Sequence, residues 1–350
     1  MADQQTPDLL LRDFAPRSML VTEDHTPTRA RFPAVDVHNH LGLRGANWAV
    51  PDVDALVRDM DEAGVRAIVN LDGRWGDALR QNLERYKEKH PDRFAVFAGV
   101  DWSRVDEPAF GEKLAVELET SVRAGAQGLK IFKALGLNVR FASGELLRAD
   151  DSRLRPIWAT AAELGIPVLF HIADPVAFFQ PLDRFNERWE ELQAHPSWHF
   201  YGPAYPSFDE LMEQQANLLS ANPKTSFISA HVASASENLK FVAGLLDRFP
   251  NLFVDISARI AELGRQPYSS RDFFVKYQDR ILFGTDQRPT PAVYRIHWRF
   301  LETADEHFDY GPGHIPAQGR WRIYGIFLPD EVLDKVYRRN AERLVPGLAG

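Results

Sequence analysis

The sequence predicts a (β/α)8 (TIM) barrel with an N-terminal extension and long loops after strands five and eight. Short apolar runs alternate with helix-like segments, as expected of a parallel sheet. There are eight such runs, the number that closes a barrel. No glycine-rich phosphate-binding fingerprint follows the first run, which disfavours an open doubly wound sheet. The length of 350 residues suits a barrel with decorated loops.

The predicted strands begin after Pro33 and recur along the chain. We place them at 34–37, 66–71, 94–100, 127–132, 167–170, 226–230, 252–256 and 281–284. We expect helices between them at 52–63, 77–90, 110–124, 152–164, 207–221, 235–249 and 268–278, and a final helix at 330–344. Gly64, Gly125 and Gly165 each stand between a helix and a strand, where a left-handed glycine ends helices.

The regions outside this alternation define the domain organisation. Residues 1–32 are polar with prolines and charges, and we expect an arm that packs outside the barrel of residues 33–350. An insertion at about 174–206 is rich in aromatic residues and proline, and a second long connection covers 302–326. Loops of this length form lids or oligomer contacts in compact domains. We therefore expect a homodimer or a higher homo-oligomer.

Composition excludes several classes of partner and site. The net charge is −8 and no basic stripe is present, so nucleic acid is not an expected partner. Without cysteine, disulfides and thiolate metal sites are impossible, and a metal would need His, Asp, Glu or a modified Lys. The N-terminus has no signal-peptide core, and no stretch is long and apolar enough for a membrane span. We expect a cytoplasmic protein that acts on a small molecule and not at a membrane.

Potential metal ligands stand at the ends of four predicted strands. His38 and His40 end the first strand, His171 the fifth, His231 the sixth and Asp286 the eighth. Barrel active sites lie at these carboxyl ends. In an extended segment, residues two apart point the same way, so His38 and His40 can converge. Burying such groups without a partner is costly, and a shared divalent cation would remove that cost.

Each residue alone has a simpler interpretation. A His-x-His pair can arise by chance, a single histidine at a strand end is commonly a hydrogen-bonded structural residue, and Asp286 could cap the next helix. The joint pattern, in which several ligand types each follow an apolar run, favours the metal site.

The motifs that carry these residues resemble the amidohydrolase superfamily, and within it the amidohydrolase-2 branch, which includes aminocarboxymuconate-semialdehyde decarboxylase and related hydratases and hydrolases. The matching segments are 35–40, 169–171, 228–231, 282–286 and 328–344, and the resemblance covers about residues 33–345. It implies a divalent metal bound by His38, His40, His171 and Asp286, with His231 as an acid/base group. Zinc suits these ligands best, and manganese or iron would also fit.

The resemblance leaves the reaction open between two classes. The first is hydrolysis of a C–O or C–N bond in a small amide, ester or lactone. There the metal lowers the pKa of its water to ~7, Asp286 takes the proton, and His231 or the metal stabilises charge on the substrate oxygen. The second is non-oxidative decarboxylation of an aromatic or muconate-like acid, with Asp286 or His231 protonating carbon. A non-catalytic binding protein is a third hypothesis, which the intact ligand set disfavours.

Lys130 decides the expected number of metals. It lies at an inward position of the fourth strand, between Leu129 and Ile131. In binuclear members of the superfamily, a comparable lysine is carboxylated and bridges two metals. Alternatively, Lys130 remains an ammonium that binds a substrate anion or pairs with Asp286. We expect one metal.

Residues of the βα loops are candidates for substrate binding. Arg44 and Trp48 follow the His-x-His motif, Arg259 follows the seventh strand, and Arg288 follows Asp286. Each of them could instead support its loop. Residues 186–189 in the insertion could cover the site or form a dimer contact.

Overall fold

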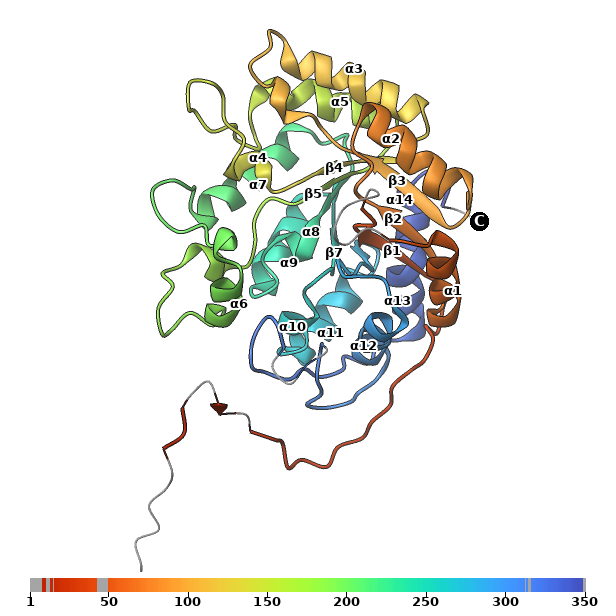
Figure 1. Ribbon diagram of the computed structural model, residues 1–350, viewed down its shortest axis with the longest axis vertical. Helices are drawn as coiled ribbons and strands as arrows, with labels where there is room; N and C mark the ends of the chain where they lie inside the picture. The colour runs from red at the N-terminus through yellow and green to blue at the C-terminus, as the bar shows by residue number, and fades with distance from the viewer. Residues whose placement is uncertain are drawn as a thin grey trace, which may run out of the picture.

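The computed structural model describes residues 8–10, 13–14, 16–42, 50–311, 313 and 316–348. Eight parallel strands form one sheet in chain order. They are β1 (Ala34–Asn39), β2 (Val65–Asn70), β3 (Phe94–Ala98), β4 (Gly128–Ile131), β5 (Val168–Phe170), β6 (Phe227–Ser229), β7 (Leu252–Asp255) and β8 (Ile281–Leu282). Each overlaps a predicted strand, and helices surround the strands (Figure 1). The predicted (β/α)8 barrel is confirmed.

Backbone hydrogen bonds join the last strand to the first. The N–H of Val37 donates to the carbonyl of Phe283 at 3.0 Å, and the N–H of Asp286 donates to the carbonyl of His38 at 2.8 Å. These bonds bring the residues after β8 beside β1. As a result, the first and last predicted ligands, far apart in sequence, meet at one point of the barrel mouth.

Helices follow the strands in the expected order. The longer ones are α1 (Val53–Ala63), α2 (Gly76–Asn82), α3 (Phe110–Arg123), α5 (Arg155–Glu163), α7 (Phe208–Ala221), α9 (Leu239–Arg248), α11 (Pro267–Lys276) and α12 (Pro291–Glu302). The shorter ones are α4 (Ala134–Leu137), α6 (Trp189–Ala194), α8 (Ala230–Ala233), α10 (Ile260–Leu263), α13 (Asp330–Asp334) and α14 (Asn340–Leu344). The segments η2 (Leu83–Glu88) and η7 (Lys335–Arg339) are π-helical, and η3 (Trp102–Arg104), η4 (Ser152–Leu154), η5 (Val176–Phe179) and η6 (Pro196–Trp198) are 3-10 turns.

Local sequence explains where the helices start and stop. Asp52 caps α1 by accepting from the N–H of Ala55 at 3.1 Å, and Gly64 ends the helix with a φ of 82°. We did not predict α12, although Thr290 caps it and Pro291 opens its first turn, which is a recognised helix start.

The core has two layers, one inside the barrel and one between strands and helices. Inward-pointing side chains such as Val35, Leu169 and Ile228 form the inner cluster, which Val345 and Leu348 join from the C-terminal segment. The carbonyl of Leu348 accepts a bond from Arg66, at the start of β2. The C-terminal segment therefore covers the end of the barrel where the strands begin, and the polar site lies at the opposite end.

The described part of the chain before β1 is extended and lies outside the ring of helices (Figure 1), and the carbonyl of Phe14 accepts a hydrogen bond from Arg320. Near the barrel it is tied to the end of α12 and to the segment that follows: the N–H of Arg31 donates to Glu302 at 3.0 Å, and Nδ1 of His25 lies 2.7 Å from Asp305. That residues 1–32 form an arm apart from the barrel stays a prediction. Among the described helices, none has the length and apolar character that crossing a bilayer requires.

Candidate metal centre

A bulge in β1 turns the two histidines of the His-x-His motif into the barrel mouth. Asp36 pairs with Ile68 and Asn39 with Asn70, so β1 holds one more residue than β2 over this stretch. An extra residue reverses the alternation of side chains. Val37 faces the inner cluster, and His38 directly after it also turns inward. His40, two residues further on, points the same way.

Asp286 lies opposite three imidazole nitrogens. Its Oδ1 is 3.9 Å from Nε2 of His38 and 3.6 Å from Nε2 of His40, and its Oδ2 is 3.8 Å from Nε2 of His231. Ligand atoms of His38, His40 and Asp286 all lie within 4.8 Å of one another. Nε2 of His38 is buried, with no hydrogen-bond partner among the described residues. A buried nitrogen lone pair beside a second imidazole and a carboxylate fits a divalent cation.

Two carboxylates fix the tautomers of these histidines. Nδ1 of His38 donates to Asp255 at 2.9 Å, and Nδ1 of His40 donates to Asp72 at 2.9 Å. With the proton on Nδ1, each Nε2 carries a lone pair toward Asp286. Such carboxylate–histidine pairs orient metal ligands and make them more basic. The sequence did not reveal either carboxylate as part of the site.

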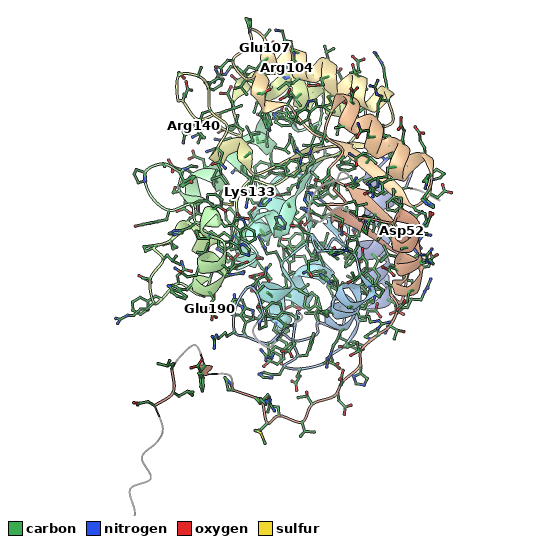
Figure 2. The ribbon with its side chains drawn as sticks, viewed as in Figure 1. Asp52, Arg104, Glu107, Lys133, Arg140 and Glu190 are labelled. Carbon is green, nitrogen blue, oxygen red and sulfur yellow. The ribbon has the colours of Figure 1, made fainter. Side chains whose placement is uncertain are left out.

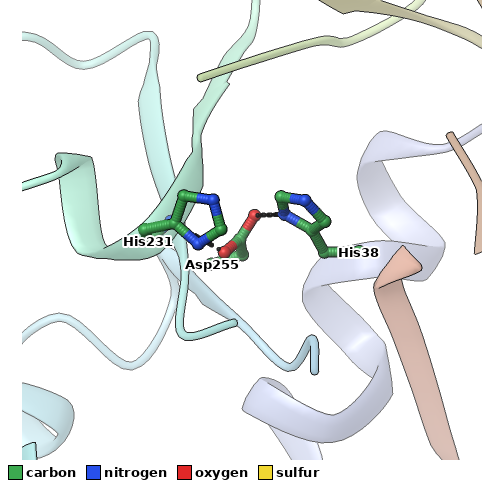
Figure 3. Close-up of side chains that lie close together, drawn as sticks. All are labelled: His38, His231 and Asp255. Carbon is green, nitrogen blue, oxygen red and sulfur yellow. Dashed lines mark hydrogen bonds and ion pairs between the residues drawn. The ribbon is translucent and has the colours of Figure 1, made fainter. Parts of the chain in front are cut away.

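Asp255 also holds the backbone of His231. Figure 3 shows its carboxylate between the two histidines, bonded to Nδ1 of His38 and to the N–H of His231, the latter at 3.0 Å. Burial acts to raise the pKa of Asp255, but the interaction with His38 and the hydrogen bonds from the Ser257 side chain and the N–H of His231 outweigh it and bring the pKa to about 2. Because both oxygens are engaged, we interpret Asp255 as an orienting group and not as a ligand of a second metal.

His171 is placed differently from the other two predicted histidine ligands. Its Nε2 lies 3.1 Å from the carbonyl of Ala173 and 3.2 Å from Asp174 Oδ1. Lys133 in turn lies 2.5 Å from Asp174 Oδ2. Burial lowers the pKa of His171 to about 4, so the ring is neutral at pH 7. His171 is not in the compact group of possible ligands, and the nitrogen that remains for a metal is Nδ1.

The backbone at His231 adopts a strained conformation. His231, Val232, Ala233 and Ser234 have φ values of 60, 56, 54 and 59°, a left-handed turn made without glycine. Each such residue costs about 1–2 kcal/mol, and strain of this kind clusters at functional sites. The turn aims the imidazole at the mouth, where Nδ1 donates to the carbonyl of Ser257 at 2.8 Å and leaves Nε2 toward Asp286. Burial holds the pKa of His231 well below its usual value.

Lys130 is buried on the inside of β4. Its side chain is 1% exposed, and Nζ has no hydrogen-bond partner in the described part of the chain. The ammonium lies 5.2 Å from the ring centroid of Phe132. Burial lowers the pKa of Lys130 to about 8, while Asp286 and Asp255 favour its charged form. The side chain is therefore mostly an ammonium at pH 7.

A cavity of about 410 Å³ opens beside the ligand group. Its lining includes His171, His231, Asp286 and Arg259, together with three aromatic residues from the long loops, Phe178, Trp198 and Tyr310. On the other side of Asp286, a second hollow includes His40, Arg74, Phe132 and Arg288. The predicted substrate residues Arg259 and Arg288 thus flank Asp286, whereas Arg44 and Trp48 lie outside the described residues.

Buried and surface ion pairs hold the insertion over the barrel mouth. Arg188, which is fully buried, donates to Glu191 at 2.7 Å and also to Glu262 after β7. In the first turn of α6, Glu190 pairs with Arg320 at 2.8 Å. Figure 2 labels Glu190 there, and Lys133 nearer the barrel. The insertion is therefore tied both to the β7 loop and to the loop after α12.

The orienting carboxylates carried weak signals in the sequence. Asp255 stands inside an apolar run, two residues after the inward-facing Phe253. An acid at such a position is buried and needs a partner. Asp72 and Asp174 follow strand ends by two and four residues, where the sequence alone does not distinguish them from ordinary loop acids.

Comparisons with known proteins agree with this architecture. Residues 35–347 match the family model described as Amidohydrolase. No curated protein sequence matches the chain. A dihydroxybenzoic acid decarboxylase from Polaromonas, solved with manganese and the inhibitor 2-nitroresorcinol, has a TM-score of 0.59 and 17% identity over 89% of this chain and 96% of its own.

Two further solved structures share the fold. The 2,6-dihydroxybenzoate decarboxylase from Rhizobium has a TM-score of 0.56 and 17% identity, over 89% of this chain and 98% of its own. The 4-oxalomesaconate hydratase from Rhodopseudomonas palustris has a TM-score of 0.51 and 14% identity, over 90% of this chain and 96% of its own. At these identities the likeness concerns the fold.

Proposed function

From the premise that this chain belongs to the amidohydrolase family and is an enzyme, we propose that it is a metal-dependent hydrolase of a C–O or C–N bond in a small organic substrate. The observation that carries the proposal is the position of Asp286, whose carboxylate lies 3.6–3.9 Å from Nε2 of His38, His40 and His231. This arrangement brings metal-binding and proton-transfer groups to one point of a cavity.

The proposed ligands are His38 and His40 through Nε2, Asp286, and His171 through Nδ1. Imidazole and carboxylate donors with an open position suit zinc, which we propose over manganese or iron. When bound, such a cation acts as a Lewis acid and lowers the pKa of a coordinated water to ~7. The buried, unpartnered Nε2 of His38 supports this assignment.

Asp286 and His231 are the proposed catalytic residues. Asp286 is 29% exposed at its side chain, so it can accept a proton from water in the cavity and pass it to a leaving oxygen or nitrogen. Nε2 of His231 faces the same point. Its buried, neutral ring can accept a hydrogen bond from a substrate hydroxyl or take up a proton.

The alternative is a non-oxidative decarboxylase of an aromatic or muconate-like acid. The aromatic wall formed by Phe178, Trp198 and Tyr310 favours a planar substrate. Structures of similar fold include decarboxylases of dihydroxybenzoates. Here Asp286 or His231, once it has taken up a proton, would protonate the carbon that loses carbon dioxide. Incorporation of ¹⁸O from labelled water indicates hydrolysis, whereas release of carbon dioxide without ¹⁸O incorporation into the organic product indicates decarboxylation.

Metal analysis tests the proposed site directly. The wild-type chain should bind close to one equivalent of zinc, whereas His171→Ala and Asp286→Ala should lose both metal and activity. The exposed His195, directly after α6, supplies the control His195→Ala, which should keep both. Full zinc occupancy in both ligand variants would refute the assignment.

A further inference from the structure

Two buried arginines near the cavity differ in how their charges are balanced. Arg188 is completely buried, and its guanidinium donates to the carboxylates of Glu191 and Glu262. Arg259 is 5% exposed, and the bond from its Nη1 goes to the carbonyl of Ala258 at 2.8 Å. Its Nε is buried with no hydrogen-bond partner among the described residues. The Nε of Arg188 is also without a partner there, but Arg188 is paired with two acids, whereas Arg259 has no comparable acid among the described residues.

The acids that line the cavity are already engaged elsewhere. Asp174 pairs with Lys133 at 2.5 Å, and Glu191 pairs with Arg188 at 2.7 Å. Asp286 faces the site histidines. Arg259 is therefore the cation of this cavity that lacks a partner at ion-pair distance, as far as the described residues extend.

Glu237 is the acid with the largest influence on Arg259. Burial lowers the pKa of Arg259, and Glu237 is the first of the acids that oppose this shift. Its Oε2 accepts a hydrogen bond from the Ser236 hydroxyl at 3.2 Å, and it forms no ion pair with the guanidinium. Since arginine remains protonated in proteins, the charge persists in the cavity wall.

A buried charge without a partner destabilises the folded state, and a bound ligand of opposite charge removes that destabilisation. The residue before Arg259 is Ala258, which has a φ of 53°, so backbone strain accompanies the placement of this side chain. The cavity of about 410 Å³ can hold a one-ring molecule between its aromatic residues. Guanidinium and carboxylate match in geometry and charge.

We propose that Arg259 anchors a carboxylate of the substrate within this cavity. The inference rests on the proposed function only for the position of the reacting bond, which the proposed function puts at the Asp286 end of the same cavity. Binding of the carboxylate by Arg259 itself requires no metal. Arg259 is thus a residue that determines specificity, apart from the metal ligands.

Calorimetric titration with benzoate and with benzamide, its neutral counterpart, tests the anchor. Benzoate should bind both the zinc-loaded and the metal-free chain, and benzamide should bind at least tenfold more weakly. Arg259→Gln should weaken benzoate binding at least tenfold, a change of about 1.4 kcal/mol, and Arg259→Lys should restore part of it. Arg265→Gln is the control, because Arg265 pairs with Glu187 at 2.8 Å at the surface of the insertion.

The outcomes separate this inference from the proposed function. Benzoate binding that requires zinc and is unchanged in Arg259→Gln would mean that the carboxylate binds the metal, which overturns the anchor and leaves the metal-dependent function intact. Failure of the chain to bind zinc, together with metal-free benzoate binding that depends on Arg259, would overturn the proposed function and support the anchor.

Thermal unfolding without ligand gives a second readout. Arg259→Met removes an unpaired buried charge, so its Tm should equal or exceed that of the wild type. The matched variant Arg188→Met breaks a buried pair and should lower the Tm by several degrees. If Arg259→Met lost as much stability as Arg188→Met, Arg259 would be a structural residue and the proposal would be wrong.

Discussion

Nδ1 of His38 lies 2.9 Å from Oδ2 of Asp255, so a side chain of the first strand is oriented by one from the seventh. The other oxygen of Asp255 accepts bonds from the N–H of His231 and from the Ser257 hydroxyl. One carboxylate thus fixes both a proposed metal ligand and the proposed acid/base group. Metal affinity should depend on Asp255 although it is not itself a proposed ligand.

Asp255→Asn tests this dependence. An amide is a weaker acceptor for Nδ1–H of His38 and can present its own N–H instead, so Nε2 becomes a poorer ligand. We expect zinc affinity to fall about 10–100-fold, the usual effect of losing an orienting group. Competition with a fluorescent zinc chelator measures it. The exposed Asp247 provides the control Asp247→Asn, and equal affinities in the two variants would contradict the prediction.

The arrangement of strands and helices was predictable because short local sequence patterns determine it. Each buried strand is a short apolar run, and glycine marks helix ends such as Gly64, where φ is 82°. The omission of α12 has a local cause as well. Its stripe of Tyr294, His297, Trp298 and Leu301 is buried, but it mixes aromatic and polar residues, so the apolar period is less obvious.

The site was predictable only in part. His38, His40 and Asp286 stand where strands end, a position that sequence reveals. The orienting acids Asp72 and Asp255 act across strands β1–β2 and β1–β7, and such pairings depend on register and closure rather than on local spacing.

The left-handed turn at His231 could not be predicted either. No glycine marks residues 231–234, although four consecutive φ values are positive there. Only the surrounding tertiary structure holds this conformation.

Lys130→Met tests the number of metals. With one metal bound by His38, His40, His171 and Asp286, this variant should keep one equivalent of zinc. Its Tm should not fall, because the change removes a buried ammonium that has no hydrogen-bond partner among the described residues. Elemental analysis and thermal unfolding provide the two measurements. Two equivalents in the wild type, reduced in Lys130→Met, would instead establish a binuclear site bridged by a modified lysine.

Ala233→Gly tests the strain beside His231. Ala233 has a φ of 54°, where a Cβ atom costs about 1–2 kcal/mol that glycine avoids. Ala161 is also fully buried but lies within the right-handed helix α5, where glycine costs about 1 kcal/mol. We expect Ala233→Gly to be neutral or stabilising and Ala161→Gly to be destabilising in urea unfolding. Equal losses in both variants would show that the turn stores no strain.

The stability of the fold should fall in mild acid, and His297 should cause part of the loss. This side chain is 1% exposed on α12, its Nδ1 donates to the carbonyl of Val293 at 2.9 Å, and burial lowers its pKa from 6.5 to about 4. Below pH 6.5 the imidazole of His297 binds a proton in the unfolded chain but stays neutral in the folded chain. The free energy of unfolding therefore decreases as the pH falls from 6.5 toward about 4 and levels off below that value.

The variant His297→Gln isolates this contribution. Glutamine does not titrate and can keep a bond to Val293. The free energy of unfolding of the variant should therefore lack the pH-dependent contribution of His297, which amounts to up to about 3 kcal/mol between pH 6.5 and 4. The comparison is made in urea on metal-free protein, so that proton competition at the metal ligands does not contribute. Above pH 7.5, the two chains should differ only by the packing effect of the substitution. A wild-type minus variant difference that stays constant from pH 8 to 4.5 would show that His297 is not held neutral by the fold.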